Sequence, residues 1–455
     1  MAVDRRTLLR MASGGALAAG LATPLARTVA QTAAPATPPP ILFVHGNGDH
    51  AAFWQTILWR FESNGYSRDR LFAFNFTDPT ARDLDAQPQP NRSSSEDQLR
   101  EITFWIDRVL GQTGARQVAL VGSSRGGNAI RNYLTQEGVA AKISHAVLCG
   151  TPNHGVFDWE ATRGNEFNGK GPFLSRLNAL PGEVTPGPAW ATIRSDSMDK
   201  YAQPDGRYLG RPGTPTGVTF EGPELKGAAN LVLPGLDHRE VAFHPRAFRE
   251  QFRFIAGREP ARLDVAREPD VRIEGLVTGL AGATPTNRPV ADAAVEVYAV
   301  APDTGERRGA ALWSARTGPA GAWGPVTVPT DAPLEFVVAA PGQPITHIYR
   351  SGFPRSSALV HLRPGRALNA AEQGGGAVLL FSRPRGYFGL PRDVVLVDGK
   401  EPGDLQRGVP ADATATLRLG EETPRPVACL FNEERVVARP WPARDNHLTI
   451  AELTY

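Results

Sequence analysis

A glycine–serine motif offers the clearest chemistry in the chain. Residues 120–128 read LVGSSRGGN, and Gly122 and Gly126 flank Ser124 in the pattern G-x-S-x-G. This pattern is typical of a tight strand-to-helix turn that presents a nucleophilic serine, and the strained turn requires small residues two positions before and after it. With Ser123 at the centre, a valine and an arginine would occupy those positions. The motif therefore predicts Ser124 as the nucleophile of an acyl-transfer reaction.

Such a reaction needs backbone N–H donors for the oxyanion that develops on the attacked carbonyl. One donor is expected to be the N–H of Arg125, the residue after the nucleophile. The second is expected in the loop after an earlier strand, and residues 43–48 (FVHGNG) end such a strand. We assign it to Asn47, with a plain glycine turn as the alternative. His45 is interpreted as structural.

A histidine should serve as the general base and should follow the acid in the chain order Ser, acid, His. Of the nine histidines, His238 lies after the apolar run NLVLPG and before a helical pattern. This is the place for a base carried on a loop. His244 directly precedes Pro245 and is interpreted as a helix cap or rim residue.

Two carboxylates compete for the role of the acid that orients the base. Asp196 and Asp199 both follow the strand pattern WATIRS. Asp199 lies deeper in the loop and is favoured, and Asp196 is the alternative acid. Asp158 is a more distant third candidate.

Alternating strand and helix patterns would position these residues. Each apolar run between residues 41 and 257 is followed by a helical pattern or a long connection, which favours βαβ units and a mostly parallel sheet. Two connections, residues 77–95 and 152–188, lack clear periodicity and would form a rim or lid. Strands are expected at 41–46, 70–76, 116–122, 142–150, 189–195 and 229–235, and helices at 51–65, 95–114, 126–138 and 244–257.

The pattern changes near residue 259. Residues 259–269 form a polar junction that contains proline, and short β-type runs with turn signals follow it. Such spacing is typical of β-sandwiches. The sequence therefore predicts a catalytic domain at 40–258, a linker at 259–269, and all-β modules at 270–363 and 364–455.

The N-terminus has the character of an export signal. Residues 1–30 carry the pair Arg5–Arg6 followed by a short run rich in Ala, Gly and Leu, which resembles a twin-arginine signal peptide. An uncleaved anchoring helix is the alternative. Residues 31–39 form a Pro/Ala leader. Removal of residues 1–30 takes away four arginines and one aspartate, so the formal net charge falls from +2 to −1.

Several partners are not supported by the sequence. No basic cluster indicates nucleic acid binding; the N-terminal apolar run is too short and too rich in glycine for a good membrane span, and no other segment is a candidate. Metal-binding and dinucleotide-binding motifs are also missing, so neither a metal nor a cofactor is predicted. The two cysteines, Cys149 and Cys429, fall in different predicted domains, and buried free thiols are favoured over a disulfide.

The quoted motifs resemble a known group of enzymes. The stretches ILFVHGNGD, TGARQVALVGSSRGGN, KISHAVLCGTPNHG and LDHREVAFHP are similar to the small secreted bacterial lipases and esterases of the α/β-hydrolase superfamily, over about residues 40–257. The resemblance implies a triad of Ser124, Asp199 and His238. In those relatives the acid lies in an S-x-D stretch, which Ser197–Asp199 matches, and the residue after His-Gly donates to the oxyanion, which implies Asn47.

The longer chain resembles prokaryotic lipases that carry a C-terminal β domain implicated in lipid binding. Residues 270–350 are similar to transthyretin-like and carboxypeptidase-regulatory-type β modules. The C-terminal modules are therefore expected to bind lipid or polymer.

Two departures from these relatives concern the nucleophile turn. Ser123 stands where relatives usually have histidine, and Arg125 stands where they have an apolar residue or glutamine. The Arg125 guanidinium either lies near the acyl pocket, where it would favour polar or acidic groups, or points away and pairs with a local carboxylate.

The expected function is that of an exported carboxylic ester hydrolase, secreted to the periplasm or beyond. Its substrate could be a short-chain ester, a triglyceride, or a polyester such as polyhydroxyalkanoate. An amidase with the same triad is a further alternative. In a different class, a lipid- or polymer-binding protein could use the hydrolase fold as a scaffold.

Overall fold

A parallel sheet forms the framework of the first half of the chain. The computed structural model describes residues 38–282, 284–403, 405–420 and 425–455; the predicted signal peptide (1–30) lies outside them, as does most of the leader (31–39). Among the described residues six parallel strands pair in the order β2-β1-β3-β4-β5-β6, as the alternating pattern predicts. The strands are β1 (Ile41–Val44), β2 (Leu71–Phe74), β3 (Val118–Ser123), β4 (Ile143–Cys149), β5 (Ala189–Arg194) and β6 (Ala229–Val232).

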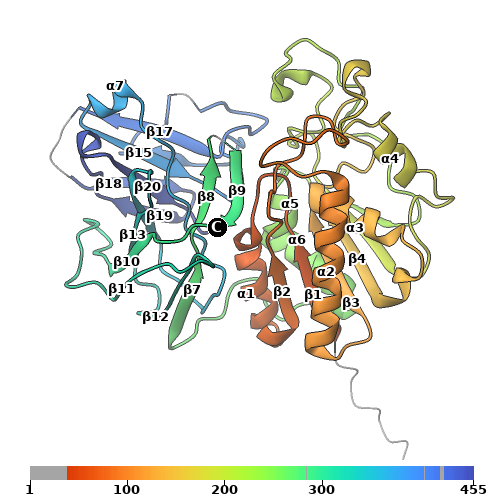
Figure 1. Cartoon of the computed structure of the whole chain (residues 1–455), viewed down its shortest axis with the longest axis horizontal. Coiled ribbons are helices and arrows are strands. Elements are labelled where there is room, and N and C mark those ends of the chain that lie inside the picture. The colour runs from red at the N-terminus through yellow and green to blue at the C-terminus, as the bar shows by residue number, and fades with distance from the viewer. Residues whose placement is uncertain (1–37, 283, 404, 421–424) are drawn as a thin grey trace, which may run out of the picture. The chain divides into compact units, whose positions relative to one another are not determined.

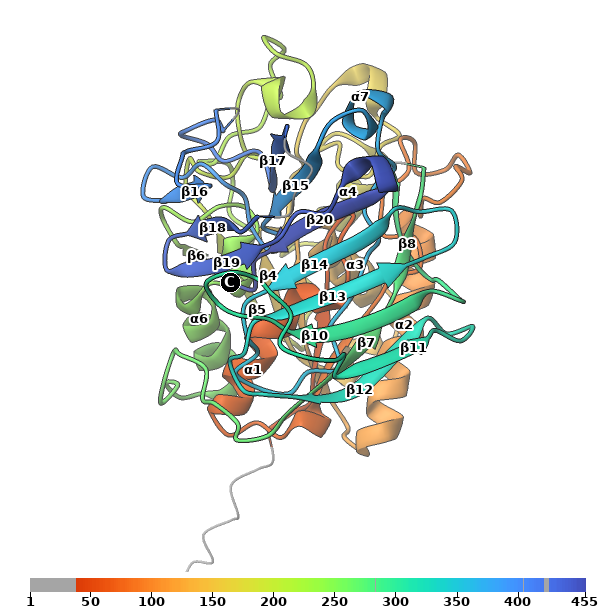
Figure 2. The ribbon, with the colours of Figure 1, turned by 90° about the vertical axis from the view of Figure 1, so that its left-hand side faces the viewer.

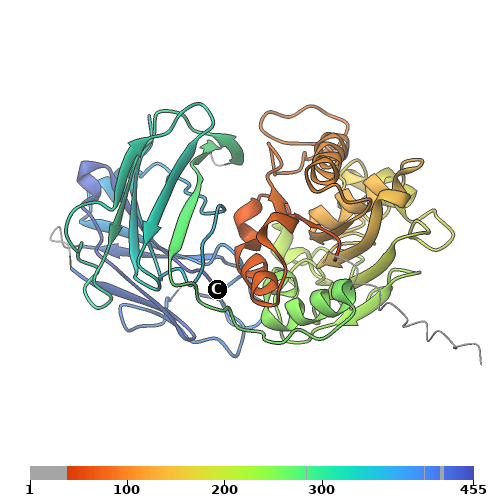
Figure 3. The ribbon, with the colours of Figure 1, turned by 90° about the horizontal axis from the view of Figure 1, so that it is seen from below.

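Helices cover both faces of this sheet, which Figures 1 and 3 show from two directions. The side chains of β1 explain the two layers, because successive residues of a strand point to opposite faces. Ile41 and Phe43 pack with α1 and α6, whereas Leu42 and Val44 pack with α2 and α3. The helices are α1 (Gln55–Ser63), α2 (Ser95–Thr113), α3 (Arg125–Leu134), α4 (Pro172–Leu177), α5 (Glu240–Phe243) and α6 (Pro245–Ala256).

The second half of the chain consists of β-sheets, and its largest sheet is seen face-on in Figure 2. The described strands of this sheet run in the order β11-β10-β13-β14-β20-β15-β17. Smaller sheets pair β12 with β7, β8 with β9, and β16 and β19 with β18. The strands are β7 (Val271–Leu276), β8 (Thr278–Ala281), β9 (Thr284–Pro289), β10 (Ala294–Ala299), β11 (Trp313–Arg316), β12 (Ala322–Val328), β13 (Leu334–Ala339), β14 (Ile345–Arg350), β15 (Ala377–Ser382), β16 (Val395–Val397), β17 (Thr414–Leu419), β18 (Val427–Phe431), β19 (Glu434–Ala438) and β20 (His447–Glu452), with one short helix, α7 (Ala370–Gln373).

The two modules predicted at 270–363 and 364–455 contribute strands to one sheet. Strand β20 lies between β14 of the first segment and β15 of the second, and it is parallel to both. The other pairs in this sheet are antiparallel. The apolar run at 358–364 is not a regular strand, but it lies along β7, with a bridge between Val277 and Leu362 and with the N–H groups of Val360 and Leu362 donating to the carbonyls of Glu274 and Leu276.

Side chains of the parallel-sheet half pack into the β-sheet half. Trp59 of α1 belongs to the hydrophobic core of the β-sheets, and its indole N–H donates to the carbonyl of Ser356. Residues 259–269 are likewise held against α1, where Arg60 donates to the carbonyl of Leu263.

Both cysteines are buried as free thiols. In the described part of the chain no helix is long and apolar enough to cross a membrane.

Candidate active site

The strand-to-helix turn between β3 and α3 has the backbone strain that the G-x-S-x-G pattern predicts. Ser124 lies at φ 51° and ψ −120°, a conformation that residues with side chains adopt rarely. A Cβ atom on Gly122 would lie 2.7 Å from the backbone nitrogen of Gly127. A Cβ atom on Gly126 would lie 2.5 Å from the carbonyl oxygen of His45. Both flanking positions therefore accept only glycine in this geometry.

The structure brings Ser124, His238 and Asp199 together in one hydrogen-bonded row. The Oγ atom of Ser124 is 3.0 Å from Nε2 of His238, and Nδ1 of His238 is 2.9 Å from Oδ2 of Asp199. Ser124 follows β3, Asp199 follows β5 and His238 follows β6. Because the strands are parallel, their carboxyl ends meet at one edge of the sheet.

The loop that carries Asp199 also supports the imidazole. The second carboxylate oxygen of Asp199 accepts a hydrogen bond from the N–H of Tyr201, at 2.8 Å. The ring of Tyr201 packs edge-on against the ring of His238, with 4.6 Å between centroids. Sequence reasoning did not single out Tyr201, because its position in an irregular loop carries no periodic signal.

The alternative acids are engaged elsewhere. The carboxylate of Asp196 accepts from the N–H of Met198 at 3.1 Å and from the N–H of Gly235 at 2.9 Å. It therefore ties together the loops that follow β5 and β6. Asp158 pairs with Lys170. Neither carboxylate is hydrogen-bonded to His238.

Two further histidines have structural roles. Nδ1 of His45 lies 2.9 Å from the carbonyl of Gly46, and its Nε2 accepts from the N–H of Phe76 at 3.0 Å. Burial lowers the pKa of His45 to about 4, so this ring is neutral at pH 7. The ring of His244 accepts from the N–H of Arg246 and caps α6, and burial lowers its pKa to about 4.

The two predicted oxyanion donors lie beside the nucleophile. Asn47 and Ser124 line the same pocket, and Arg125 begins α3 directly after Ser124. In the described part of the chain the backbone N–H of Asn47 has no backbone acceptor, and Arg125 is the first residue of α3, where a helix leaves the N–H without an internal partner. Both donors are therefore available to a bound oxygen atom.

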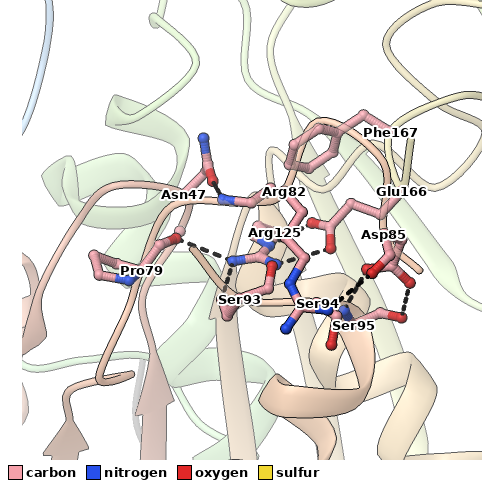
Figure 4. A network of polar contacts seen from close by, with 12 residues as sticks. Asn47, Pro79, Arg82, Asp85, Ser93, Ser94, Ser95, Arg125, Glu166 and Phe167 are labelled. Carbon is pink, nitrogen blue, oxygen red and sulfur yellow. Dashed lines mark hydrogen bonds and ion pairs between the residues drawn. The ribbon is translucent and has the colours of Figure 1, made fainter. Parts of the chain in front are cut away.

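The Arg125 side chain points away from this pocket into a buried polar network, shown in Figure 4. Its guanidinium forms a bidentate ion pair with Glu166, in which Nη2 lies 2.8 Å from Oε2. It also donates to the carbonyl of Pro79 at 3.1 Å, and to the hydroxyl and carbonyl of Ser93. The sequence left two orientations open for this side chain, toward the acyl pocket or toward a local carboxylate. In the structure the guanidinium pairs with a carboxylate.

The same network fastens the turn that contains Asn47. The Asn47 side chain accepts from the N–H of Ala81 at 2.7 Å, and the N–H of Gly48 donates to the carbonyl of Pro79 at 3.1 Å. The carbonyl of Pro79 thus receives hydrogen bonds from both the Asn47–Gly48 turn and Arg125. The connection at 77–95 is a fixed rim rather than a loose loop, because its backbone is bonded both to the Asn47–Gly48 turn and to Arg125.

Burial makes this network costly to break. Arg125 is 0% exposed and Glu166 is 2% exposed. Burial raises the pKa of Glu166, and the neighbouring Arg125 charge opposes this rise. Glu166 was not predicted, since it lies 41 residues from Arg125 in an irregular segment.

Two pockets adjoin His238. The smaller, of about 210 Å³, contains Ser124 and Asn47 and has a largely apolar wall of Pro152, Val156, Phe157, Phe167 and Leu209. The larger, of about 440 Å³, extends on the side of Asp199 and Tyr201 and is lined partly by Thr192, Arg194 and Asn230. Tyr387, from the second half of the chain, also lines the smaller pocket.

In the described residues no group of three or more His, Cys, Asp or Glu side chains could hold a metal ion.

A parallel sheet with helices on both faces, and a strained serine on the turn between β3 and α3, define the class of α/β-hydrolases. Residues 38–147 match the family model of lipase (class 2), and residues 269–367 match that of the lipase C-terminal domain. Over these segments the chain is similar to the class 2 lipases and to lipase C-terminal domains. Both matches support a hydrolase of the lipase and esterase group.

Solved structures with some similarity to the chain include three hydrolases. A lipase from Bacillus licheniformis is 18% identical over 45% of this chain and 86% of its own, with a TM-score of 0.32. A carboxylesterase from Bacillus subtilis is 14% identical over 49% of this chain and 86% of its own, with a TM-score of 0.28. A phospholipase from Legionella pneumophila is 12% identical over 91% of this chain and 93% of its own, with a TM-score of 0.34.

Proposed function

We propose that the protein hydrolyses carboxylic esters through a serine nucleophile. The observation that carries this proposal is the row of hydrogen bonds from Ser124 through His238 to Asp199, at 3.0 and 2.9 Å. In this arrangement the imidazole can take the hydroxyl proton while the carboxylate holds its tautomer and stabilises its charged form. No metal or cofactor is needed for this chemistry.

The reaction proceeds in two halves. Ser124 Oγ attacks the ester carbonyl, its proton passes to Nε2 of His238, and the oxyanion accepts hydrogen bonds from the N–H groups of Asn47 and Arg125. The protonated His238 then gives its proton to the departing alkoxide, which leaves as the alcohol. A water molecule, deprotonated by His238, attacks the acyl-enzyme, and the acid leaves as Ser124 regains its proton.

The pocket at the nucleophile favours a small, uncharged acyl group. Its volume of about 210 Å³ lies below the roughly 300–1,000 Å³ of pockets that take drug-sized ligands. The Arg125 charge is compensated by Glu166, away from the substrate. We therefore propose short-chain esters as the preferred substrates, with long-chain triglycerides and polyesters as the alternatives that a substrate profile must compare.

Covalent labelling tests the function directly. A fluorophosphonate should add to wild-type protein at a peptide that contains Ser124, and the variant Ser124→Ala should neither be labelled nor hydrolyse p-nitrophenyl butanoate. Ser175→Ala, which changes an exposed serine of α4, is the matched control and should keep wild-type turnover. Wild-type turnover in Ser124→Ala would contradict the proposal.

We also propose export through the twin-arginine pathway, supported by the pair Arg5–Arg6 in the sequence. Replacement of both residues by lysine should keep the protein in the cytoplasm of its host. Equal amounts of both forms outside the cytoplasm would contradict this route.

A further inference from the structure

The loop that carries His238 is fastened to a segment of the β-sheet half, residues 383–387. Oδ2 of Asp237 accepts from the N–H of Tyr387 at 2.7 Å and from Nη1 of Arg383 at 3.1 Å. The same Nη1 donates to the carbonyl of Tyr387, at 2.6 Å, so Arg383 also fixes its own segment. Asp237 directly precedes His238 and is fully buried.

Asp237 also shapes the turn in which His238 lies. Its Oδ1 accepts from the N–H groups of Arg239 and Glu240, both at 2.7 Å. Arg383 reaches the carboxylate of Glu240 as well, with Nη2 2.6 Å from Oε1. One buried guanidinium from the β-sheet half therefore pairs with the two carboxylates on either side of His238, and Arg392 also pairs with Glu240, at 2.6 Å. Removal of Arg383 would leave the buried Asp237 carboxylate without this ion pair.

The ring of Tyr387 contacts two cations that adjoin the proposed triad. The ammonium of Lys200, the residue after Asp199, is 3.8 Å from the ring centroid. The guanidinium of Arg239, the residue after His238, is 5.0 Å from it. Cations over an aromatic face are attracted to the ring, and more strongly where water is excluded. The loops of the acid and of the base thus meet at one aromatic side chain.

Backbone carbonyls of the β-sheet half hold these cations in place. Lys200 Nζ donates to the carbonyl of Ala411 at 2.7 Å, and Arg239 Nη1 donates to the carbonyl of Pro384 at 3.0 Å. Arg239 also pairs with Asp49 at 2.7 Å. The contacts that orient the two loops therefore run to the β-sheet half as well as to the parallel sheet.

Tyr387 is at the same time a wall of the smaller pocket, which it lines together with Ser124, His238 and Asn47. Apart from Tyr387, the residues that line this pocket belong to the first half of the chain. A group bound there would contact a side chain that lies about 260 residues beyond the nucleophile in sequence.

We propose that residues 383–387 complete the active site, with Tyr387 as the residue that limits acyl length and Arg383 as a positioning residue for His238. This inference rests on the proposed ester hydrolase function. It assigns part of the site to the β-sheet half of the chain.

Acyl-length profiles test the role of Tyr387. In Tyr387→Ala, kcat/KM for p-nitrophenyl octanoate relative to the butanoate should rise about 10-fold, the effect of a few methylenes gaining space in an apolar pocket. Tyr387→Phe keeps the ring and should keep the wild-type ratio. Tyr298→Ala, on β10, is the matched control and should also keep it. A wild-type ratio in a folded Tyr387→Ala would overturn this role.

Kinetic constants test the role of Arg383. In Arg383→Met, kcat should fall about 100-fold with KM within about twofold of wild type, because a displaced base slows chemistry more than binding. Arg383→Lys, which keeps the charge, should recover part of the loss. Arg366→Met, which removes a partly exposed arginine paired with the buried Glu372, is the control and should keep wild-type kcat.

The rate of labelling by the fluorophosphonate distinguishes a wrong role for Arg383 from a wrong proposed function. Slow but complete labelling of Ser124 in Arg383→Met would show a nucleophile with a poorly placed base, as expected. Labelling at the wild-type rate with wild-type kcat would overturn the role of Arg383 and leave the proposed function intact. Turnover in Ser124→Ala would instead overturn the proposed function. If Arg383→Met fails to fold, Arg383→Lys and Tyr387→Ala carry the test.

Discussion

The Arg125 guanidinium and the Glu166 carboxylate form a bidentate ion pair beneath the rim of the candidate active site. The pair joins the first residue of α3 to a segment 41 residues further along the chain. Arg125 therefore adds no free charge to the pocket that contains Ser124. Its side chain bonds instead to Pro79 and Ser93 of the connection at 77–95.

Removal of one member of this pair should destabilise the fold. In Arg125→Met, Glu166 stays buried without its partner, and the free energy of unfolding should fall by about 3–5 kcal/mol. The double variant Arg125→Met/Glu166→Gln should recover part of this loss, because no uncompensated charge remains. Denaturant titration of the wild type, both single variants and the double variant measures the coupling. Additive losses would contradict a direct interaction.

The two candidate acids should differ sharply in turnover. Asp199→Asn removes the charge beside Nδ1 of His238, and kcat should fall by about 10⁴-fold. Asp196→Asn is the matched control, since among the described residues its carboxylate accepts from backbone groups and a neighbouring serine and not from His238. Its kcat should stay within about threefold of wild type. The reverse ranking would assign the acid to Asp196.

Two glycine-to-alanine changes should have opposite effects on stability. Gly126→Ala places a methyl group 2.5 Å from the carbonyl oxygen of His45, so the turn must distort and activity should be lost. Gly111→Ala, on the exposed face of α2, meets no atom within 4 Å and should raise the free energy of unfolding by about 1 kcal/mol. Thermal unfolding and ester hydrolysis of both variants check the contrast.

Acid should destabilise the protein through His45. The pKa of this buried ring is lowered to about 4 in the folded chain, against about 6.5 when unfolded. As the pH falls from about 6.5 to about 4, the unfolded state binds a proton that the folded state does not, and stability falls by up to about 3 kcal/mol. His45→Gln should weaken this slope, measured by urea unfolding at several pH values. An unchanged slope would place the acid sensitivity elsewhere.

Local patterns predicted the first half of the fold well. The runs at 41–46, 116–122 and 142–150 each became a strand, because an apolar run followed by a helical pattern has few other ways to be buried. The β-sheet half was predicted less fully. The runs that became β12, β14 and β18 gave no clear signal, and the place of β20 depends on pairing with strands far away in sequence.

For the candidate site, too, the sequence predicted some residues and missed others. Ser124 and His238 lie in short patterns whose spacing is itself informative, and the structure brings them together as expected. Glu166 and Tyr387 lie in irregular segments, and their partners are 41 and 150 residues away. The periodicity of a short sequence segment does not indicate contacts between residues so far apart. Their roles follow from the folded chain alone.

The position of β20 sets an order for assembly. Residues 447–452 separate β14 from β15, so the seven-stranded sheet becomes continuous only after this late segment has been synthesised. Segment 383–387, which contacts the turn of His238, directly follows β15 of the same sheet. During translation the turn of Ser124 therefore emerges about 260 residues before the segment that contacts the turn of His238. Under the proposed function, a ribosome-bound chain that has not reached residues 383–387 would carry Ser124 without this support for His238.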